Sequence, residues 1–335
     1  MSKIIVVIGL TGQQGGSVAD AFLEEKGWKV RGVTRDPTKA TGWSKRGVDV
    51  VEGDLDDKSS LMKAFEGAYA VFGTTDFWGP VSDPASKLKL GSGQKINEYA
   101  FNCEVQRGKN IAEAAAETES VERFITSALP NARACTNGRL KHVYHFDSKA
   151  AVVEYVKRSL PTLAKKMSVL YIGSYMTNWG QGIQPRQHLN KTWRLSLVGK
   201  GDTPIPHLFT SKDTGFLVHA LLQLSPGTVL SGAGDILSWK ECLHVWCKTQ
   251  GLDYGGFDEI SVEDFIQHSG MGTELGLEFG EMFAFMDSPG YNGGGDSVIF
   301  PKDVCIPPGS STIQHSTYKD LVKISLPVDI IRRLV

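Results

Sequence analysis

This sequence has almost no net charge and no long apolar run, and each absence argues against a class of function. Its 335 residues carry 36 lysines and arginines against 37 aspartates and glutamates, which leaves a formal net charge of −1. Binding to nucleic acid or to an anionic membrane through charge needs an excess of basic residues, so we expect neither. No apolar run approaches the roughly 18 residues that span a bilayer. We therefore expect a cytoplasmic protein, with the nucleus left open as a second location.

Cysteine is scarce as well. The five cysteines are odd in number and scattered, which argues against a disulfide framework and favours a reducing compartment. Cys242, His244 and Cys247 have a spacing that can suit a metal ion, but they fall in one amphipathic segment after Ser238, a typical helix-capping residue. Because no second pair of ligands is apparent, we predict a helix here and no metal site.

A glycine-rich turn directly follows an apolar strand at the start of the chain. Ile4–Ile8 leads into the run GLTGQQG, which begins at Gly9. Gly9 allows a tight turn, Gly12 lets backbone N–H groups approach a pyrophosphate, and Gly15 lets the next helix pack closely on the strand. The order of strand, turn and helix predicts a dinucleotide-binding site.

The end of the second strand indicates which dinucleotide is bound. An acidic residue there would bind a ribose 2′-hydroxyl, and an arginine would bind a 2′-phosphate. Arg35 stands at this place, and its planar guanidinium can pair with phosphate through two hydrogen bonds. Asp36 comes one residue later, before Pro37, and is interpreted as a turn residue. The pattern favours NADP(H) as the cofactor.

Strands and helices alternate from the N-terminus onward, which predicts a Rossmann-type α/β fold with a doubly wound parallel sheet. The expected strands are 4–8, 30–33, 48–52, 70–73, 123–126 and 168–171, and the expected helices are 16–25, 58–65, 104–116 and 149–160. Residues 76–102 are polar and punctuated by glycine and proline, so we expect a mobile loop at the carboxyl edge of the fourth strand.

The alternation fades after Tyr171, which suggests two domains. We predict an NADP(H)-binding Rossmann domain over residues 1–172, with a later segment near 210–235 returning to it. Residues 173–335 are expected to form a smaller, irregular α/β domain that binds the substrate or a partner.

Six stretches of the chain carry a specific resemblance when they are taken together. They are GLTGQQGGSVA at Gly9–Ala19, GVTRDP at Gly32–Pro37, GVDVVEGDLDD at Gly47–Asp57, AVFGTTDFW at Ala70–Trp78, HFDSKAAVVEY at His145–Tyr155 and SYMTNW at Ser174–Trp179. Over nearly its whole length the chain resembles the NmrA-like family, a branch of the atypical short-chain dehydrogenase/reductases whose members bind NADP(H).

The resemblance implies a set of cofactor contacts. The pyrophosphate would be held by the glycine-rich turn, the 2′-phosphate by Arg35, and the adenine edge by Asp54 and Leu55. In the turn the implied residues are Gly9, Thr11, Gly12, Gln13 and Gln14. The residues implied to line the nicotinamide half are Thr75, Asp76, Phe77, Lys149, Ser174, Tyr175 and Met176.

The predicted catalytic residues are Lys149, His145 and Ser127. Related short-chain dehydrogenases place a tyrosine four residues before a lysine, one helical turn away on the same face, and that tyrosine protonates the substrate oxygen. Here His145 takes the place of the tyrosine, and Tyr144 lies about 100° around the helix. Ser127 follows the fifth strand, where the relatives carry a serine that orients the substrate oxygen.

Two interpretations of this departure stay open. In the first, Lys149 or His145 transfers the proton, because histidine titrates near neutral pH and a lysine in a cationic or apolar neighbourhood can shift towards it. Lys149 would be the donor by analogy with isoflavone-reductase-like relatives, which also lack the tyrosine. In the second, nothing donates a proton and the protein is a redox sensor that reports the NADP(H) pool to a regulatory protein partner.

Aromatic side chains favour the first interpretation, since they suit a pocket for an organic substrate. The candidates are Phe77, Trp78, Tyr175, Trp179, Phe279, Phe283 and Tyr291, of which Phe279 and Phe283 are expected to be core residues of one helix face. We predict an NADPH-dependent oxidoreductase that reduces a carbonyl, enone or imine of a small organic substrate.

Overall fold

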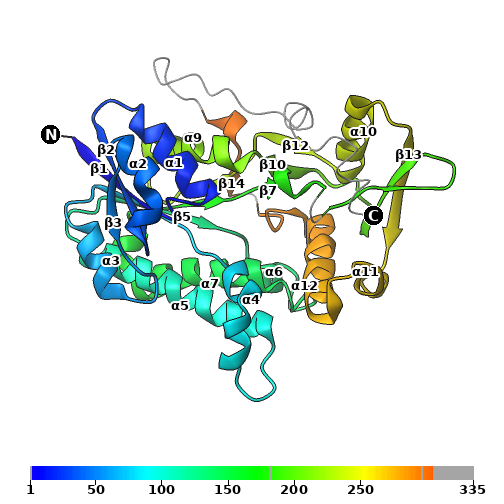
Figure 1. Ribbon diagram of the computed structural model, residues 1–335, viewed down its shortest axis with the longest axis horizontal. Helices are drawn as coiled ribbons and strands as arrows, with labels where there is room; N and C mark the ends of the chain where they lie inside the picture. The colour runs from blue at the N-terminus through cyan, green and yellow to red at the C-terminus, as the bar shows by residue number, and fades with distance from the viewer. Residues whose placement is uncertain (1, 181–182, 296, 305–335) are drawn as a thin grey trace.

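The computed structural model describes residues 2–180, 183–295 and 297–304, and its main feature is an eight-stranded parallel sheet in the order β14-β11-β6-β5-β4-β1-β2-β3 (Figure 1). The strands are β1 (Lys3–Ile8), β2 (Trp28–Thr34), β3 (Asp49–Glu52), β4 (Ala70–Gly73), β5 (Arg123–Ala128), β6 (Met167–Tyr171), β11 (Val229–Ser231) and β14 (Val298–Ile299). Chain order reverses beside β1, as in doubly wound sheets. The predicted Rossmann-type fold is confirmed. The last part of the predicted second domain, with Cys305, lies outside the described residues.

Alternate residues of β1 build two cores, one on each face of the sheet. Ile5 and Val7 belong to the core beneath helices α1 (Gln13–Leu23) and α9 (Thr210–Gln223). Val6 and Ile8 belong to the other core. The helices on that second face are α3 (Lys58–Phe65), α5 (Ile96–Glu117) and α7 (Tyr144–Ser159). This period of two is what a strand covered on both faces requires.

Helix α9 lies about two thirds of the way along the chain and packs directly on α1. The Gly215 N–H donates to Ser17 Oγ at 3.0 Å, and a Cβ added at Gly215 would lie 2.2 Å from the Ser17 carbonyl oxygen. The segment 210–235 thus supplies strand β11 to the large sheet and helix α9 to the layer that covers one of its faces. Strand β14 joins the same sheet, although its sequence lies in the region that we expected to form the smaller domain.

Two three-stranded sheets and three helices make up most of the rest of the structure, which lies to the right in Figure 1. The first sheet contains β7 (Ser174–Tyr175), β10 (Ile205–Leu208) and β12 (Asp235–Leu237), and the second β8 (Arg186–Gln187), β9 (Trp193–Val198) and β13 (Tyr254–Ile260). The helices are α10 (Trp239–Gln250), α11 (Val262–His268) and α12 (Gly272–Phe285). Ser238 caps α10 by accepting from the Glu241 N–H, so the predicted helix is confirmed.

Three helices start several residues away from the predicted positions, and their ends differ by one or two residues. Helix α1 begins at Gln13, α5 at Ile96 and α7 at Tyr144, each several residues earlier than expected. Residues 76–102 are also not an irregular loop. They contain the short helix α4 (Trp78–Ser82), the 3-10 helix η2 (Pro84–Lys89) and the first turns of α5, with Asp76 and Asp83 capping the two short helices.

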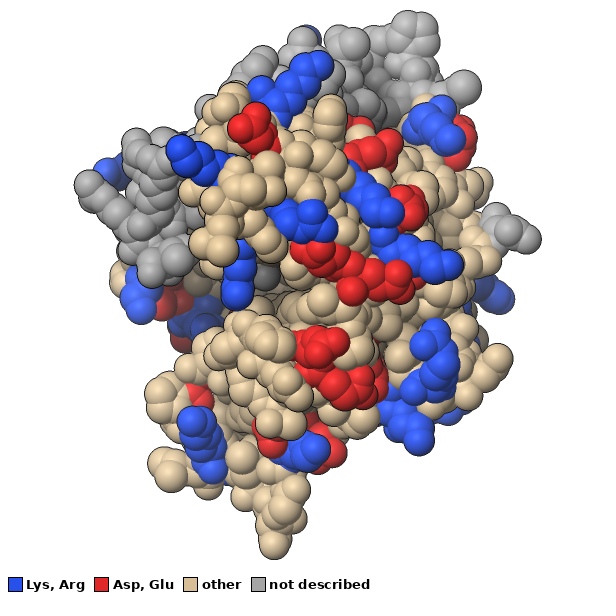
Figure 2. Space-filling view, turned by 90° about the vertical axis from the view of Figure 1, so that its right-hand side faces the viewer, with Lys and Arg blue, Asp and Glu red and all other residues tan. Residues whose placement is uncertain are grey.

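Further short helices connect these elements. They are η1 (Pro37–Ala40), α2 (Thr41–Lys45), α6 (Ala132–Cys135), α8 (Pro161–Ala164), η3 (Met176–Asn178), the π-turn η4 (Met286–Gly290) and η5 (Pro301–Asp303). On the face that carries the smaller sheets, acidic side chains gather near the middle with lysines and arginines around them (Figure 2). Neither sign covers that face, in keeping with the balanced composition.

Candidate functional site

The glycine-rich turn forms an open anion site at the N-terminus of α1. Gly9 has a left-handed φ of +71°, and its carbonyl oxygen accepts the Gly12 N–H at 2.9 Å. A Cβ at Gly15 would lie 2.2 Å from that same oxygen, so only glycine fits there. Helix α1 starts after Gly12 with no side-chain cap and no acidic residue in its first turn. Its free N–H groups therefore suit a pyrophosphate.

The end of β2 presents an exposed arginine beside a fixed aspartate. Asp36 Oδ1 accepts hydrogen bonds from the Thr38 hydroxyl and, at 3.0 Å, from the Thr38 N–H, and so caps η1. These two hydrogen bonds hold the pKa of Asp36 below its ordinary range. The interpretation of Asp36 as a turn residue is confirmed. Arg35 is exposed and forms no ion pair with any residue that the structure describes. Its guanidinium is available for a 2′-phosphate.

The loop after β3 is held from the side by α5. The Leu55 carbonyl oxygen accepts from Asn110 Nδ2 at 2.7 Å, and Asp54 Oδ1 accepts the Asp56 N–H at 3.0 Å. Arg107 binds Asp56 through two hydrogen bonds of 2.8 Å, which lower the pKa of that carboxyl. Asp54 and Leu55 thus stand on a braced loop next to the predicted adenine site.

The residues after β4 are mostly engaged in local structure. Thr75 Oγ1 donates to Glu104 Oε1 at 2.7 Å. The Asp76 carboxylate accepts the N–H groups of Trp78 and Gly79 at 3.0 and 3.1 Å and so caps α4. The Phe77 ring is buried in the core. Their predicted contacts with a nicotinamide stay predictions.

Lys149 forms a buried ion pair with Glu104 of α5. Glu104 is completely buried and accepts from Thr75 Oγ1, from Ser148 Oγ and from Lys149 Nζ. The neighbourhood of Lys149 is therefore anionic, which differs from the cationic or apolar surroundings considered above. We missed Glu104 in the sequence, although it has a signal: it is an acidic residue on the same helix stripe as the buried Ala100, Gly108 and Ile111.

His145 lies one turn before Lys149 and is held by Glu278 of α12. The His145 ring nitrogen Nδ1 lies 2.7 Å from Glu278 Oε1, and the His145 backbone N–H donates to the same oxygen at 3.0 Å. Asn97 Nδ2 donates to the other oxygen of Glu278, which has no exposed surface. Glu278 also stands on a buried helix stripe and was also missed. Tyr144 points elsewhere, with its hydroxyl 3.5 Å from Glu98 Oε1.

Two buried polar atoms at the carboxyl edge of the sheet have no hydrogen-bond partner among the described residues. They are Ser127 Oγ and Gln14 Oε1. Ser127 lines a cavity of about 10 Å³ beside Lys149. Gln14 Nε2 donates to the Tyr175 hydroxyl at 2.7 Å, and burial raises the pKa of Tyr175 to about 12. Unpartnered donors and acceptors at this edge fit a polar ligand such as the nicotinamide half of a dinucleotide.

Buried residues that follow β6 flank Tyr175. Ser174 and Met176 are buried, and Ser174 pairs with His207 in the β7–β10 register. Of the seven candidate aromatic residues, four are core residues: Phe77, Trp179, Phe283 and Tyr291. Trp78 and Phe279 are half-buried and stack on each other with ring centres 5.2 Å apart and planes 9° apart. This stack joins α4 to α12 next to His145, whose ring centre lies 5.0 Å from that of Trp78.

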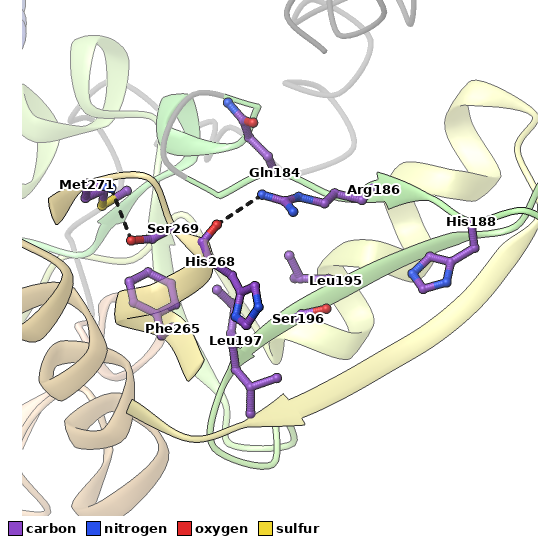
Figure 3. A pocket seen from close by; sticks show the side chains of 11 residues that line it. Gln184, Arg186, His188, Leu195, Ser196, Leu197, Phe265, His268, Ser269 and Met271 are labelled. Atoms are coloured by element: carbon purple, nitrogen blue, oxygen red, sulfur yellow. Dashed lines mark hydrogen bonds between the residues drawn. The ribbon is translucent and has the colours of Figure 1, made fainter. Parts of the chain in front are cut away.

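A larger cavity of about 380 Å³ lies between β9 and α11, away from the sheet edge (Figure 3). Its apolar floor includes Leu195, Leu197 and Phe265, and Figure 3 shows Arg186 and His188 on its rim. None of the predicted site residues lines it. Within residues 2–180, 183–295 and 297–304 there is no cluster of three metal-ligating side chains, and no helix is long and apolar enough to cross a membrane.

Comparisons with known proteins agree with this geometry. The NmrA-like family oxidoreductase notA of Aspergillus sp. (strain MF297-2) is 27% identical over 286 residues, which cover 80% of this chain and 78% of that protein. The crystal structure of NmrA, a negative transcriptional regulator, in complex with NAD has a TM-score of 0.72 at 17% identity and covers 100% of this chain and 98% of that one. Triphenylmethane reductase of Citrobacter sp., complexed with NADP(H), has a TM-score of 0.64 at 16% identity, with coverage of 97% and 100%.

The family assignment rests on the length of the match. The sequence pattern of the NmrA-like family matches residues 1–323, and the fold agrees with that of the solved structures along almost the whole chain. The resemblance inferred from the six motifs is confirmed, and the chain belongs to the NmrA-like family.

Proposed function

We propose that this protein is an NADPH-dependent oxidoreductase that reduces a carbonyl, enone or imine of a small organic substrate. One observation carries the proposal. Helix α7 holds His145 and Lys149 one turn apart, each against a completely buried carboxylate, Glu278 and Glu104. An ordered lysine–carboxylate pair and an ordered histidine–carboxylate pair beside the carboxyl ends of β4 and β5 are suited to binding a cofactor and handling a proton where the nicotinamide of a Rossmann-type fold is expected.

The residues present fit NADP(H). The turn from Gly9 to Gly15 would hold the pyrophosphate with backbone N–H groups, and exposed Arg35 would hold the 2′-phosphate. Ser127 Oγ and Gln14 Oε1, which have no partner among the described residues, would form hydrogen bonds with the nicotinamide half or with the substrate. When bound, NADPH would supply the hydride. The half-buried stack of Trp78 and Phe279 would form an apolar wall that excludes water from a planar substrate.

The comparisons support the proposal without defining the substrate. The matched relative notA is named an oxidoreductase, and the triphenylmethane reductase structure contains NADP(H). The Escherichia coli protein described as an NADPH-dependent quinone oxidoreductase has the same fold, with a TM-score of 0.63.

Calorimetric titration with NADP⁺, NADPH, NAD⁺ and NADH, together with NADPH oxidation across quinones, aldehydes, enones and imines, tests the proposal. We expect tight NADPH binding and oxidation that depends on the added substrate and disappears in Lys149→Ala. Lys157→Ala removes an exposed lysine of the same helix and is the matched control. Tight binding that distinguishes the oxidised from the reduced cofactor, without turnover, would overturn the proposal in favour of a redox sensor with a protein partner.

A further inference from the structure

Lys149 and His145 of α7 are held in different ways. The ammonium of Lys149 is bound to Glu104 Oε1 inside a network that already includes Thr75 and Ser148. Separating such a buried pair leaves an uncompensated charge on each side, which typically costs several kcal/mol. Lys149 is thus placed to bind a cofactor hydroxyl with its remaining N–H groups rather than to give up its proton.

His145 is held at one ring nitrogen only. Nδ1 and the backbone N–H both meet Glu278 Oε1, at 2.7 and 3.0 Å, and Asn97 holds the second oxygen of Glu278 in place. The other ring nitrogen, Nε2, has no hydrogen-bond partner among the described residues, and the His145 side chain keeps about 10% of its surface exposed. A carboxylate that accepts Nδ1–H fixes the tautomer and orientation of the ring and stabilises the imidazolium.

We propose that His145 Nε2 is the proton donor to the substrate and that Glu278, which belongs to α12, is its positioning residue. This inference rests on the proposed function. Hydride addition to the substrate forms a C–H bond and moves the electron pair of the C=O or C=N bond, or of the conjugated enone, onto oxygen or nitrogen. That atom takes the proton from His145 Nε2–H, which leaves the neutral imidazole with Nδ1–H still bonded to Glu278. Solvent then returns the proton to Nε2.

The groups around His145 permit this role. Glu278 faces it from α12, and Asp147 lies near it on α7, where burial raises the pKa of the Asp147 carboxyl. Lys149 and Tyr144 are the other ionisable groups on this part of α7, and α5 contributes Asn97 with Glu98 beside it. The rings of Phe77, Trp78 and Phe279 enclose the imidazole with uncharged surface.

The chain contains a matched control for Glu278. Glu281 lies three residues later on α12 and makes the same kind of contact with His142: its oxygens accept the backbone N–H groups of Lys141 and His142, both at 2.7 Å, and meet His142 Nδ1 at 2.8 Å. No ring contact joins His142 to the Trp78–Phe279 stack among the described residues. A purely structural role for these carboxylates predicts equal effects of Glu278→Gln and Glu281→Gln.

Two measurements test the proposal. The first is ¹⁵N NMR of histidine-labelled, cofactor-free protein, in which His145 should show the Nδ1–H tautomer when neutral and lose that preference in Glu278→Gln but not in Glu281→Gln. The second is steady-state NADPH oxidation with NADPH affinity measured separately. His145→Gln should lower kcat by about 100-fold or more with little change in NADPH affinity, as for loss of a general acid. Glu278→Gln should lower kcat by roughly tenfold or more, and imidazole in the buffer should partly restore His145→Ala.

Each other outcome has a definite meaning. If wild-type protein oxidises NADPH and His145→Gln keeps its kcat within twofold, His145 is not the donor and the proposed reductase function stands. If Glu278→Gln and Glu281→Gln have equal effects on kcat and tautomer, Glu278 has no positioning role. If the wild-type protein binds NADPH but turns over no substrate, the proposed function fails and the proton-transfer role fails with it, whatever tautomer His145 shows.

Discussion

The two ends of the predicted cofactor site are built in different ways. The pyrophosphate end is made of backbone, where Gly9, Gly12 and Gly15 follow one another within a single turn and the N-terminus of α1 comes next. The nicotinamide end is made of side chains, where Glu104, His145, Lys149 and Glu278 come from three helices. The first end is local in sequence and the second is assembled only by folding.

This difference separates binding from chemistry. A backbone turn can recognise a phosphate in any protein of this architecture, whereas buried ion pairs determine what a particular protein can do with the bound cofactor. We therefore expect changes at the pyrophosphate end to act mainly on cofactor affinity and changes at the nicotinamide end to act mainly on stability and turnover.

Glu104→Gln should have the largest effect on stability. It leaves the Lys149 ammonium buried without its carboxylate, and breaking a buried pair in this way costs about 3–5 kcal/mol. Urea unfolding followed by circular dichroism measures the loss. Glu154→Gln, which breaks the exposed pair with Lys157 on α7, should cost less than about 1 kcal/mol. Equal losses of stability in Glu104→Gln and Glu154→Gln would show that the Glu104–Lys149 pair is not a buried ion pair. The double variant Glu104→Gln, Lys149→Met removes both charges and should recover much of the stability.

Gly15→Ala should come next, with a stability loss of about 1–3 kcal/mol and a larger loss of NADP(H) affinity. The added Cβ would lie 2.2 Å from the Gly9 carbonyl oxygen, so the turn must move. Thermal unfolding and calorimetric titration measure the two effects. Gly42→Ala is the control, because a Cβ at Gly42 meets nothing within 4 Å. Wild-type affinity in Gly15→Ala would show that the pyrophosphate is bound elsewhere.

Arg35→Ala should weaken NADP(H) binding by about 1.5–3 kcal/mol, the magnitude of a charge-assisted hydrogen bond, and leave NAD(H) binding nearly unchanged. Titration of both cofactors gives the comparison. Lys39→Ala removes another exposed cation of the same segment, one that lies 3.5 Å from Asp36, and should change neither affinity appreciably. Equal losses for NADP(H) and NAD(H) in Arg35→Ala would refute the assignment of Arg35 to the 2′-phosphate.

Tyr175→Phe should have the smallest effect, about 1 kcal/mol at neutral pH for the lost hydrogen bond from Gln14. Burial raises the pKa of Tyr175 from its ordinary 10 to about 12. Between these values the unfolded chain releases the proton and the folded chain keeps it, so wild-type stability falls as pH rises from 10 towards 12. The fall in stability with pH should be shallower in Tyr175→Phe than in the wild type. The control is Tyr254→Phe, which removes the hydroxyl of an exposed tyrosine and should leave the fall as steep as in the wild type. Unfolding in urea at pH 9, 10 and 11 measures it.

The fold and the geometry of the glycine-rich turn could be predicted from the sequence because their signals are local. An apolar run, glycines at fixed spacing and Ser238 before α10 each act on their neighbours in the chain. The start of α7 was missed for the opposite reason. Its N-cap, Val143, has no side-chain cap, and the N–H groups of residues 141, 142 and 145 are satisfied by Glu281 and Glu278 from α12.

The side chains that meet at the predicted nicotinamide end could be named only in part, because the contacts between them are not local. His145 and Lys149 lie within one motif and could be named, but the carboxylates that hold them lie 133 and 45 residues away along the chain. An acidic residue on a buried helix stripe is the signal that remains in the sequence. It indicates that a partner exists without indicating which residue the partner is.

The packing of α9 on α1 has a consequence for the time course of synthesis. The Gly215 N–H and the Ser17 hydroxyl that it meets are 198 residues apart. At about 5–20 residues per second, α9 leaves the ribosome roughly 10–40 s after α1. Until then Val18 and Phe22 lack part of their final cover. The first strand and helix of the nascent chain therefore stay incompletely packed until a helix two thirds of the way along the message has been translated.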